Sequence, residues 1–219
     1  MIAYAGFERS DPPTPEQMAW LKANSNLSWC GYYLGPTPSH FARTWRGRRA
    51  GLVAAGWGLA PIYVGQQVQG PGSEIVTPGQ GALDGADTCR LLAAEGFPPG
   101  AFVYLDLENG PPFTTPQQQY VAAWIDAVLA CGYSPSVYCS FLFAKDVQAL
   151  RPGVRIWVFH VRTVAPHRVL DDRFPDPDPA SSGFTGAAIW QHDDSAVISC
   201  AGQRLLVDLD SAASDDPSK

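Results

Sequence analysis

Two acidic residues separated by one position, Asp106 and Glu108, lie at the end of the apolar run Ala101–Leu107. Side chains alternate between the two faces of a strand, so Tyr104, Asp106 and Glu108 share one face. The rise over two residues is about 6.6 Å, which brings the carboxyl groups within mutual influence and separates their pKa values. One carboxyl group protonated near neutral pH and one charged partner are what glycoside hydrolysis requires.

Two further apolar runs also end in acidic residues. Glu8 follows Ile2–Phe7, and Asp208 and Asp210 end the run that starts at Arg204. An isolated Asp-x-Glu is also typical of a solvated turn or a helix cap. Because three runs end in this way, and because the strand ends of a parallel barrel meet at one face, we expect the acids to converge. The catalytic candidates are Glu8, Asp106, Glu108 and Asp208.

Aromatic rings in or beside the apolar runs offer stacking surfaces for sugars. The candidate substrate-binding residues are Tyr32, Tyr63, Tyr104, Tyr138, His160, Trp190 and Gln191. Tyr104 and Trp190 are favoured because they neighbour the acids, although aromatic residues in strands also commonly belong to a core. His192 is followed by two aspartates, but the spacing matches no ligand motif. We therefore expect no metal ion and no cofactor.

Short apolar runs alternate with helical patterns along the chain, and this alternation predicts parallel strands. The eight expected strands are Ile2–Phe7, Ser28–Leu34, Leu59–Val64, Ala101–Leu107, Ser136–Cys139, Arg155–Val161, Ala187–Trp190 and Arg204–Leu209. The expected helices are Pro15–Ala23, Ala42–Ala55, Leu83–Glu95, Pro116–Ala130 and Phe141–Leu150.

Eight strands predict an α/β fold of the TIM-type (β/α)8 barrel class, in one domain over residues 1–219. No convincing helix follows Arg151, so we expect a compact barrel with helices reduced in its C-terminal half. An open, doubly wound sheet is the alternative.

The composition excludes several classes of partner. The chain has 15 Lys and Arg residues against 21 Asp and Glu, a net charge of −6, which is unfavourable for binding a phosphate backbone. Nucleic acid is therefore not expected. The uncharged stretch 50–73 is interrupted by Pro61 and several glycines, so we expect no membrane span. A monomer is expected.

The N-terminus and the cysteines bear on the compartment. Glu8 and Arg9 lie where a secretory signal would need apolar residues, so we expect a cytoplasmic protein or export by a signal outside this sequence. Five cysteines leave at least one unpaired, and none forms a Cys-x-x-Cys pair. Cys30 and Cys139 lie in apolar runs and are predicted to be buried free thiols, which favours a reducing compartment.

These motifs resemble those of a known family. The segments Tyr104–Glu108, Trp190-Gln191 and Val207–Asp210 are similar to the lysozyme (muramidase) family of barrel glycoside hydrolases. The whole chain, including Gly6–Ser10 and Ala60–Gln66, more closely resembles a bacterial family described as glycoside-hydrolase-like, without a settled activity.

The resemblance implies roles for the acidic residues. Glu108 matches the general acid, and Asp106 matches the carboxylate that steadies the acetamido group of the substrate or the developing positive charge. Asp208 matches the acid of the closing strand. Glu8 stands where muramidases have an aspartate. The strand with Ile62–Val64 lacks the histidine that muramidases usually carry in it. Both departures bear on specificity more than on fold.

The sequence thus predicts a glycoside hydrolase that acts on an amino-sugar polymer such as peptidoglycan by carboxylate general acid catalysis. A barrel that binds glycan in a hydrolase-like cleft without cleaving it is the alternative. A phosphodiesterase on the same barrel would need paired histidines and a metal site, which the sequence does not offer.

Overall fold

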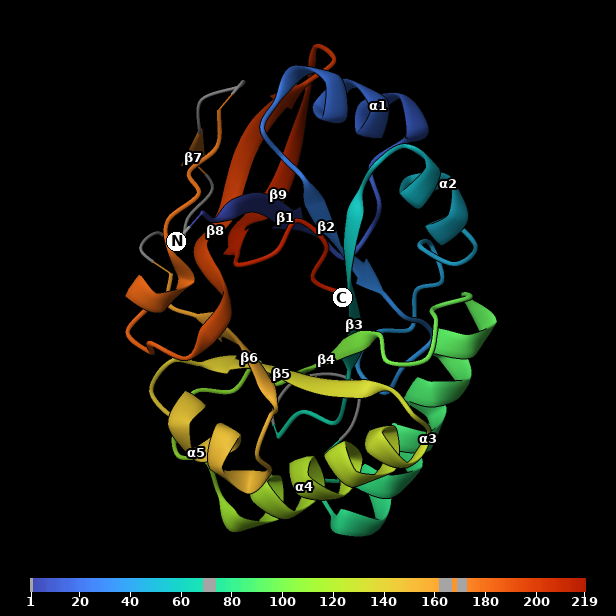
Figure 1. Ribbon diagram of the computed structural model, residues 1–219, viewed down its shortest axis with the longest axis vertical. Coiled ribbons are helices and arrows are strands. Elements are labelled where there is room, and N and C mark those ends of the chain that lie inside the picture. Colours follow the sequence, from blue (N-terminus) through green and yellow to red (C-terminus); the bar gives the residue numbers. More distant parts are fainter. Residues whose placement is uncertain (1, 69–73, 162–166, 169–172) are drawn as a thin grey trace.

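A closed ring of eight strands forms the centre of the molecule (Figure 1). The computed structural model describes residues 2–68, 74–161, 167–168 and 173–219. The ring consists of β1 (Tyr4–Glu8), β2 (Trp29–Tyr33), β3 (Gly58–Val64), β4 (Phe102–Asp106), β5 (Ser134–Ser140), β6 (Arg155–Phe159), β8 (Ala187–Cys200) and β9 (Gln203–Ala212). The short strand β7 (His167–Arg168) pairs with β8 outside the ring. The predicted TIM-type barrel is confirmed.

The last strand runs against the direction of the others. Strands β1 to β6 pair in parallel, and β8 is parallel to β6. β9 is antiparallel to both β8 and β1, and so closes the ring as one arm of a hairpin. The reason is the short connection: only Ala201 and Gly202, both with positive φ, separate β8 from β9. A connection of this length fits a hairpin and excludes a crossover helix.

Helices cover much of the outside of the ring, and the first of them packs against β8 (Figure 1). They are α1 (Pro15–Asn24), α2 (Arg49–Ala54), α3 (Pro78–Ala94), α4 (Thr115–Ala130) and α5 (Ala144–Leu150). Among the described residues after α5, the only helical segment is the short 3-10 turn η1 (Pro179–Ser181). The predicted loss of helices in the C-terminal half is confirmed.

Helix α3 begins five residues before its predicted start, because glycines that are typical of a turn belong to its first turns. The Thr77 hydroxyl accepts a hydrogen bond from the Gln80 amide at 3.2 Å and caps the helix. A Cβ at Gly81 would lie 2.3 Å from the Tyr120 carbonyl oxygen on α4. Glycine at this position therefore allows the two helices to pack closely.

The inner and outer faces of the strands carry different side chains. The inner cluster is made of Trp29, Ala60, Ile62, Val64, Tyr104, Trp157, Ile189 and Ala212, whereas the outer residues pack against the helices. The C-terminal tail closes one end of the ring, where Figure 1 shows the C-terminus. There the Phe102 amide donates to the Ser218 carbonyl at 2.9 Å, and Tyr104 donates to that of Pro217 at 3.0 Å.

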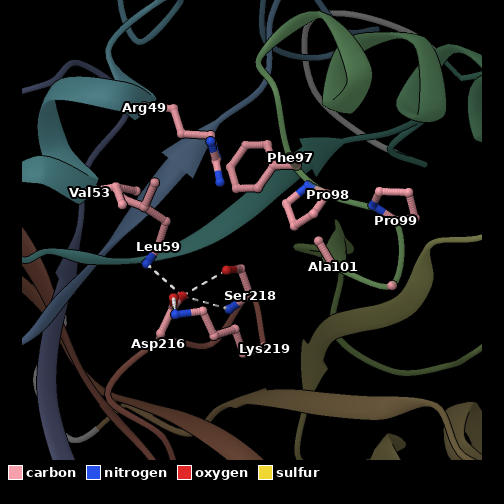
Figure 2. A pocket seen from close by; sticks show the side chains of 11 residues that line it. Arg49, Val53, Leu59, Phe97, Pro98, Pro99, Ala101, Asp216, Ser218 and Lys219 are labelled. Carbon is pink, nitrogen blue, oxygen red and sulfur yellow. Dashed lines mark hydrogen bonds and ion pairs between the residues drawn. The ribbon is translucent and has the colours of Figure 1, made fainter.

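Asp216 anchors this tail to β3. Its carboxylate accepts hydrogen bonds from the Leu59 amide at 3.2 Å and from the Ser218 hydroxyl at 2.7 Å (Figure 2). Burial acts to raise the pKa of Asp216, but these bonds and an ion pair to Lys219 at 2.9 Å together lower it below its ordinary value. The C-terminal tail thus covers the end of the barrel where the parallel strands begin, and it lines a pocket of about 260 Å³ there with Leu59 and Ala101 (Figure 2). The predicted acids lie at the opposite end.

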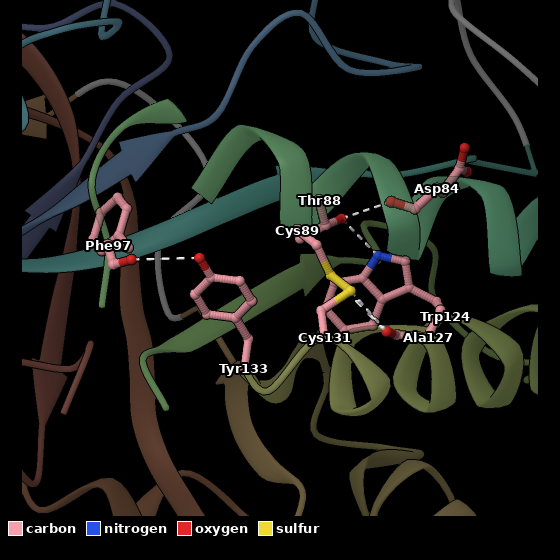
Figure 3. The surroundings of a disulfide bond; sticks show 8 residues. All are labelled: Asp84, Thr88, Cys89, Phe97, Trp124, Ala127, Cys131 and Tyr133. Atoms are coloured by element: carbon pink, nitrogen blue, oxygen red, sulfur yellow. Dashed lines mark hydrogen bonds between the residues drawn. A yellow bond between two sulfur atoms is a disulfide. The ribbon is translucent and has the colours of Figure 1, made fainter. Parts of the chain in front are cut away.

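A disulfide joins α3 to the residue that follows α4. Cys89 and Cys131 are linked with a Cα–Cα distance of 6.3 Å (Figure 3). Cys30 and Cys139 are buried free thiols, as predicted, and Cys200 is a third. A disulfide is typical of an oxidising compartment, whereas the sequence favoured a reducing one. It joins residues 42 positions apart, and only the packing of α3 on α4 brings them together.

In the described parts of the chain, helices reach neither the length nor the apolar character that crossing a membrane requires.

Candidate active site

An acidic cleft of about 320 Å³ opens at the end of the barrel where the parallel strands finish. Its lining consists of Glu8, Tyr33, Asp106, Glu108, Tyr138, Phe159, Val161, Gln191, Asp194 and Asp208. The four acids proposed from the sequence therefore face one space. They come from β1, from β4 with the residues that follow it, and from β9.

The register of β1 and β9 explains how Asp208 reaches the cleft. Glu8 is opposite Asp208, and Gly6 is opposite Asp210. Because β9 is antiparallel, Asp208 lies within the strand and not at the strand end that the sequence analysis assumed. Alternation directs Asp208 and Asp210 to the same side, so Asp210 lies one layer deeper.

A bulge in β8 brings further groups to Asp208. The pairing of β8 with β9 is irregular between Gln191 and Ala196, and Ser195 has a φ of 60°. The Ser195 amide donates to Asp208 Oδ1 at 2.7 Å, and the Ser195 hydroxyl donates to Asp194 Oδ1 at 2.9 Å. The bulge thus places Asp194 in the lining and an amide donor on Asp208, a use of bulges that is common beside active sites.

Glu8 is almost fully buried, and Tyr33 donates a hydrogen bond to its carboxylate. Burial and the nearby negative charge of Asp208 raise the pKa of Glu8, the Tyr33 hydrogen bond lowers it, and the net value is about 8. Burial also raises the pKa of Asp208 to about 7, against the effect of the Ser195 amide. Both groups hold protons at a pH where ordinary carboxyl groups are charged.

Asp106 and Glu108 differ in their access to solvent. Asp106 is 5% exposed, and its Oδ1 atom has no hydrogen-bond partner. Burial and the charges of Glu108 and Glu8 raise the pKa of Asp106 well above its ordinary value. Glu108 is exposed on the rim, and the pKa of its carboxyl group is raised by partial burial against the cleft wall. Glu108 can therefore reach a bound molecule at the rim, whereas Asp106 lies deeper in the cleft.

Trp157 and Asp210 lie beneath the residues that line the cleft. The indole Nε1 donates to Asp210 Oδ1 at 3.0 Å, while the other oxygen of this fully buried carboxyl has no hydrogen-bond partner. Burial, then the charges of Glu8 and Asp208, raise the pKa of Asp210 well above its ordinary value. The Trp157 ring meets Tyr138 edge-on at 5.5 Å.

Gln67, which sequence reasoning missed, holds the end of β4. Its side-chain nitrogen donates to the Asp106 carbonyl at 2.8 Å, and its side-chain oxygen accepts from the Glu108 amide at 3.2 Å. Gln67 is 5% exposed and lies three residues after the end of β3. One side chain therefore fixes the backbone at both acids of the Asp-x-Glu segment. Its type alone gave no signal, because the contact depends on β3 lying beside β4.

Two of the predicted substrate-binding residues line the cleft. Tyr138 and Gln191 face it, and the Tyr138 hydroxyl donates to Gln191 Oε1 at 2.5 Å. Tyr33 also lines it, although the sequence analysis selected its neighbour Tyr32. Tyr32 lies on the outer face of β2, where its hydroxyl donates to Glu95 at 2.5 Å. The alternation that begins at the inward Trp29 identifies Tyr33 as the inner residue.

The remaining predicted substrate-binding residues lie away from the cleft. Tyr63 packs on the outer face of β3 with the helices. Tyr104 points into the barrel at the opposite end, where its hydroxyl donates to the Pro217 carbonyl. Trp190 points outward, since its neighbours Ile189 and Gln191 point inward. His160 stacks on Phe141 with a centroid distance of 3.9 Å. None of these residues is in the cleft lining, and the period of two along each strand accounts for Tyr63 and Trp190.

No group of three or more His, Cys, Asp or Glu side chains among the described residues is arranged to hold a metal ion.

Several solved structures share this fold at low sequence identity. An uncharacterised B. stearothermophilus protein has a TM-score of 0.69 at 16% identity, with 95% of each chain covered. The Tat-secreted protein Rv2525c of Mycobacterium tuberculosis, crystallised with L-tartrate, has a TM-score of 0.63 at 13% identity, covering 97% of this chain and 95% of that one. A bacterial lysozyme from Streptomyces coelicolor has a TM-score of 0.60 at 13% identity, covering 96% and 92%.

No curated protein matches this chain significantly by sequence. Residues 19–198 do match the family described as the Rv2525c-like, glycoside hydrolase-like domain. The match spans most of the chain and agrees with the resemblance that the acidic motifs indicated. The protein belongs to this family of Rv2525c-like, glycoside hydrolase-like domains.

Proposed function

We propose that this protein is a glycoside hydrolase that cleaves an amino-sugar polymer such as peptidoglycan. The observation that carries the proposal is the convergence of Glu8, Asp106, Glu108 and Asp208 on one cleft at the barrel mouth. The similarity in fold to a bacterial lysozyme supports the choice of substrate.

Glu108 is the proposed general acid. It lies on the rim, where it can reach the leaving oxygen, and its raised pKa favours the protonated form needed to donate. Asp106 lies deeper, and its unpaired Oδ1 is placed to stabilise positive charge that develops on the sugar. Asp208 and Glu8 are proposed to position the attacking water and, when ionised, to add negative charge beside the sugar.

The test of this function is the release of new reducing ends from purified peptidoglycan by the wild-type protein. The control is a variant in which all four acids are replaced by their amides, because any release that it retains comes from a contaminant. Release by the wild type alone supports the hydrolase. Binding of peptidoglycan by both proteins without release by either one would instead support the glycan-binding alternative.

Replacing Gln67 by leucine is expected to reduce turnover without removing any acid. The change leaves the Asp106 carbonyl and the Glu108 amide unpaired, at a cost of about 1–3 kcal/mol. It also removes the contacts that fix the backbone of this segment. A displacement of the acids by a fraction of an ångström lowers kcat by about tenfold. Steady-state kinetics on peptidoglycan, together with thermal unfolding, measure both effects.

Gln17 offers a matched control. It is also a buried glutamine with two side-chain hydrogen bonds, to the Thr14 amide and to Gln203, but it lies on α1 away from the cleft. Gln17→Leu should lower stability and leave kcat unchanged. Equal kcat losses in the two variants would mean that Gln67 acts only through stability.

A further inference from the structure

The cleft presents charges of one sign. Among the described residues that line it, five are acidic, namely Glu8, Asp106, Glu108, Asp194 and Asp208, and none is Lys, Arg or His. Asp210 lies directly beneath. A glycan that carries carboxylates or phosphates near the scissile bond would be repelled by this lining, whereas a neutral glycan would gain no charge–charge attraction from it.

The cleft lining is also rich in carboxyl oxygens and poor in nitrogen donors. Both of its tyrosine hydroxyls are already engaged, Tyr33 with Glu8 and Tyr138 with Gln191. The side-chain amide of Gln191 is the only nitrogen-bearing side chain in the described lining. An acetamido carbonyl needs a donor, whereas an ammonium group needs acceptors and provides three N–H groups.

An acceptor without a partner lies in the wall of the cleft. Asp106 is 5% exposed, lines the space, and has an Oδ1 atom with no hydrogen-bond partner. A buried carboxylate oxygen without a partner is costly, and a ligand that donates to it removes this cost. The described acids do not form a group that could hold a metal ion, so a compact divalent cation is the poorer fit.

We propose that the cleft selects amino sugars whose amines are free, so that the substrate is a de-N-acetylated glycan in which a glucosamine ammonium group donates to Asp106. This inference rests on the proposed function of the same cleft, and it specifies the substrate class. Binding of a cation among acids with raised pKa values also releases protons, since the positive charge favours the ionised carboxylates.

The experiment compares two probes of equal length, a chitosan tetramer with free amines and a fully acetylated chitin tetramer. Calorimetry measures the affinity of each tetramer for the Glu108→Gln variant, which lacks the proposed general acid and so leaves the tetramers uncleaved. The pH is 6, below the usual range of an amine pKa. We expect the chitosan tetramer to bind at least about tenfold more tightly, with the difference shrinking in 0.5 M salt. Titrations in buffers of different ionisation enthalpy should show proton release with chitosan only.

Site specificity is tested by adding Asp106→Asn or Asp126→Asn. Asp126 is an exposed acid on α4 that pairs with Arg151, so its replacement removes the same charge far from the cleft. Only Asp106→Asn should abolish the preference. A preference that both variants retain or both lose would overturn the inference, because it would reflect general attraction to an acidic protein.

The outcomes separate this inference from the proposed hydrolase. Equal or weaker binding of chitosan, with cleavage of acetylated peptidoglycan by the wild type, would overturn the inference and leave the hydrolase standing. Chitosan preference at Asp106 without cleavage of either glycan would support the inference for a binding protein. Binding of neither tetramer would overturn it.

Discussion

Replacing Glu108 by glutamine is expected to lower kcat for peptidoglycan cleavage by about 10²- to 10⁴-fold, the usual contribution of a general acid. The substitution keeps the shape of the side chain and removes its proton. KM should change little, because Glu108 lies on the rim and the deeper Asp106, Asp208 and Glu8 still form the cleft. The measurement is the initial rate of reducing-end release over a range of substrate concentrations.

Glu16→Gln is the matched control, since Glu16 is an exposed glutamate in the first turn of α1. Its rate should equal that of the wild type. Glu8 is the rival acid, because its pKa of about 8 also keeps it protonated at neutral pH. Its burial and its hydrogen bond with Tyr33 hold it away from a leaving group on the rim. Full activity of Glu108→Gln and loss of activity in Glu8→Gln would reverse this assignment.

The free energy of unfolding is expected to fall by a few kcal/mol as the pH rises from about 5 to 9. Folding raises the pKa of Glu8 from its ordinary value of 4.5 to about 8. Within this window the folded protein holds a proton that the unfolded chain has released, so raising the pH favours unfolding. Asp208, with a pKa raised to about 7, acts in the same direction. Urea unfolding at pH 5.5, 7.0 and 8.5 measures the slope.

Glu8→Gln should flatten this slope and make the protein more stable than the wild type at pH 8.5, because it removes a buried charge. Asp126→Asn serves as the comparison. Its exposed ion pair with Arg151 lowers the pKa of Asp126, so its small contribution is present above the ordinary pKa and is lost in acid. It should leave the slope above pH 5.5 unchanged. A slope that persists in Glu8→Gln would assign the pH dependence to other groups.

A stability that decreases toward alkaline pH is the expected cost of gathering acids in one cleft. Each carboxyl group there is partly removed from water and faces like charges, and both effects disfavour ionisation. Active sites commonly sacrifice stability in this way. Partial burial in the same cleft raises the pKa of Glu108 and so favours the protonated form that is proposed to donate.

The sequence by itself determined the barrel class and the acids of the cleft. Apolar runs of strand length alternate with capped helical patterns, and that local signal predicts β/α units without knowledge of any contact. The three acid-terminated runs also pointed to one rim. Side chains alternate with a period of two along each strand. Counted from Trp29 in β2, this alternation predicts that Tyr33 and not Tyr32 faces inward. Counted from Gln191 in β8, it predicts that Trp190 faces outward.

Only the tertiary structure decided how the site is completed. The two-residue turn before β9 reverses the closing strand, so the register with β1, and not a strand end, brings Asp208 opposite Glu8. Gln67 contacts the β4 acids because β3 and β4 are neighbours, and Cys89 meets Cys131 because α3 packs on α4. Such contacts join residues far apart in the chain. Local propensity and spacing carry no information on them, because they arise when the ring closes and each strand acquires a neighbour and a register.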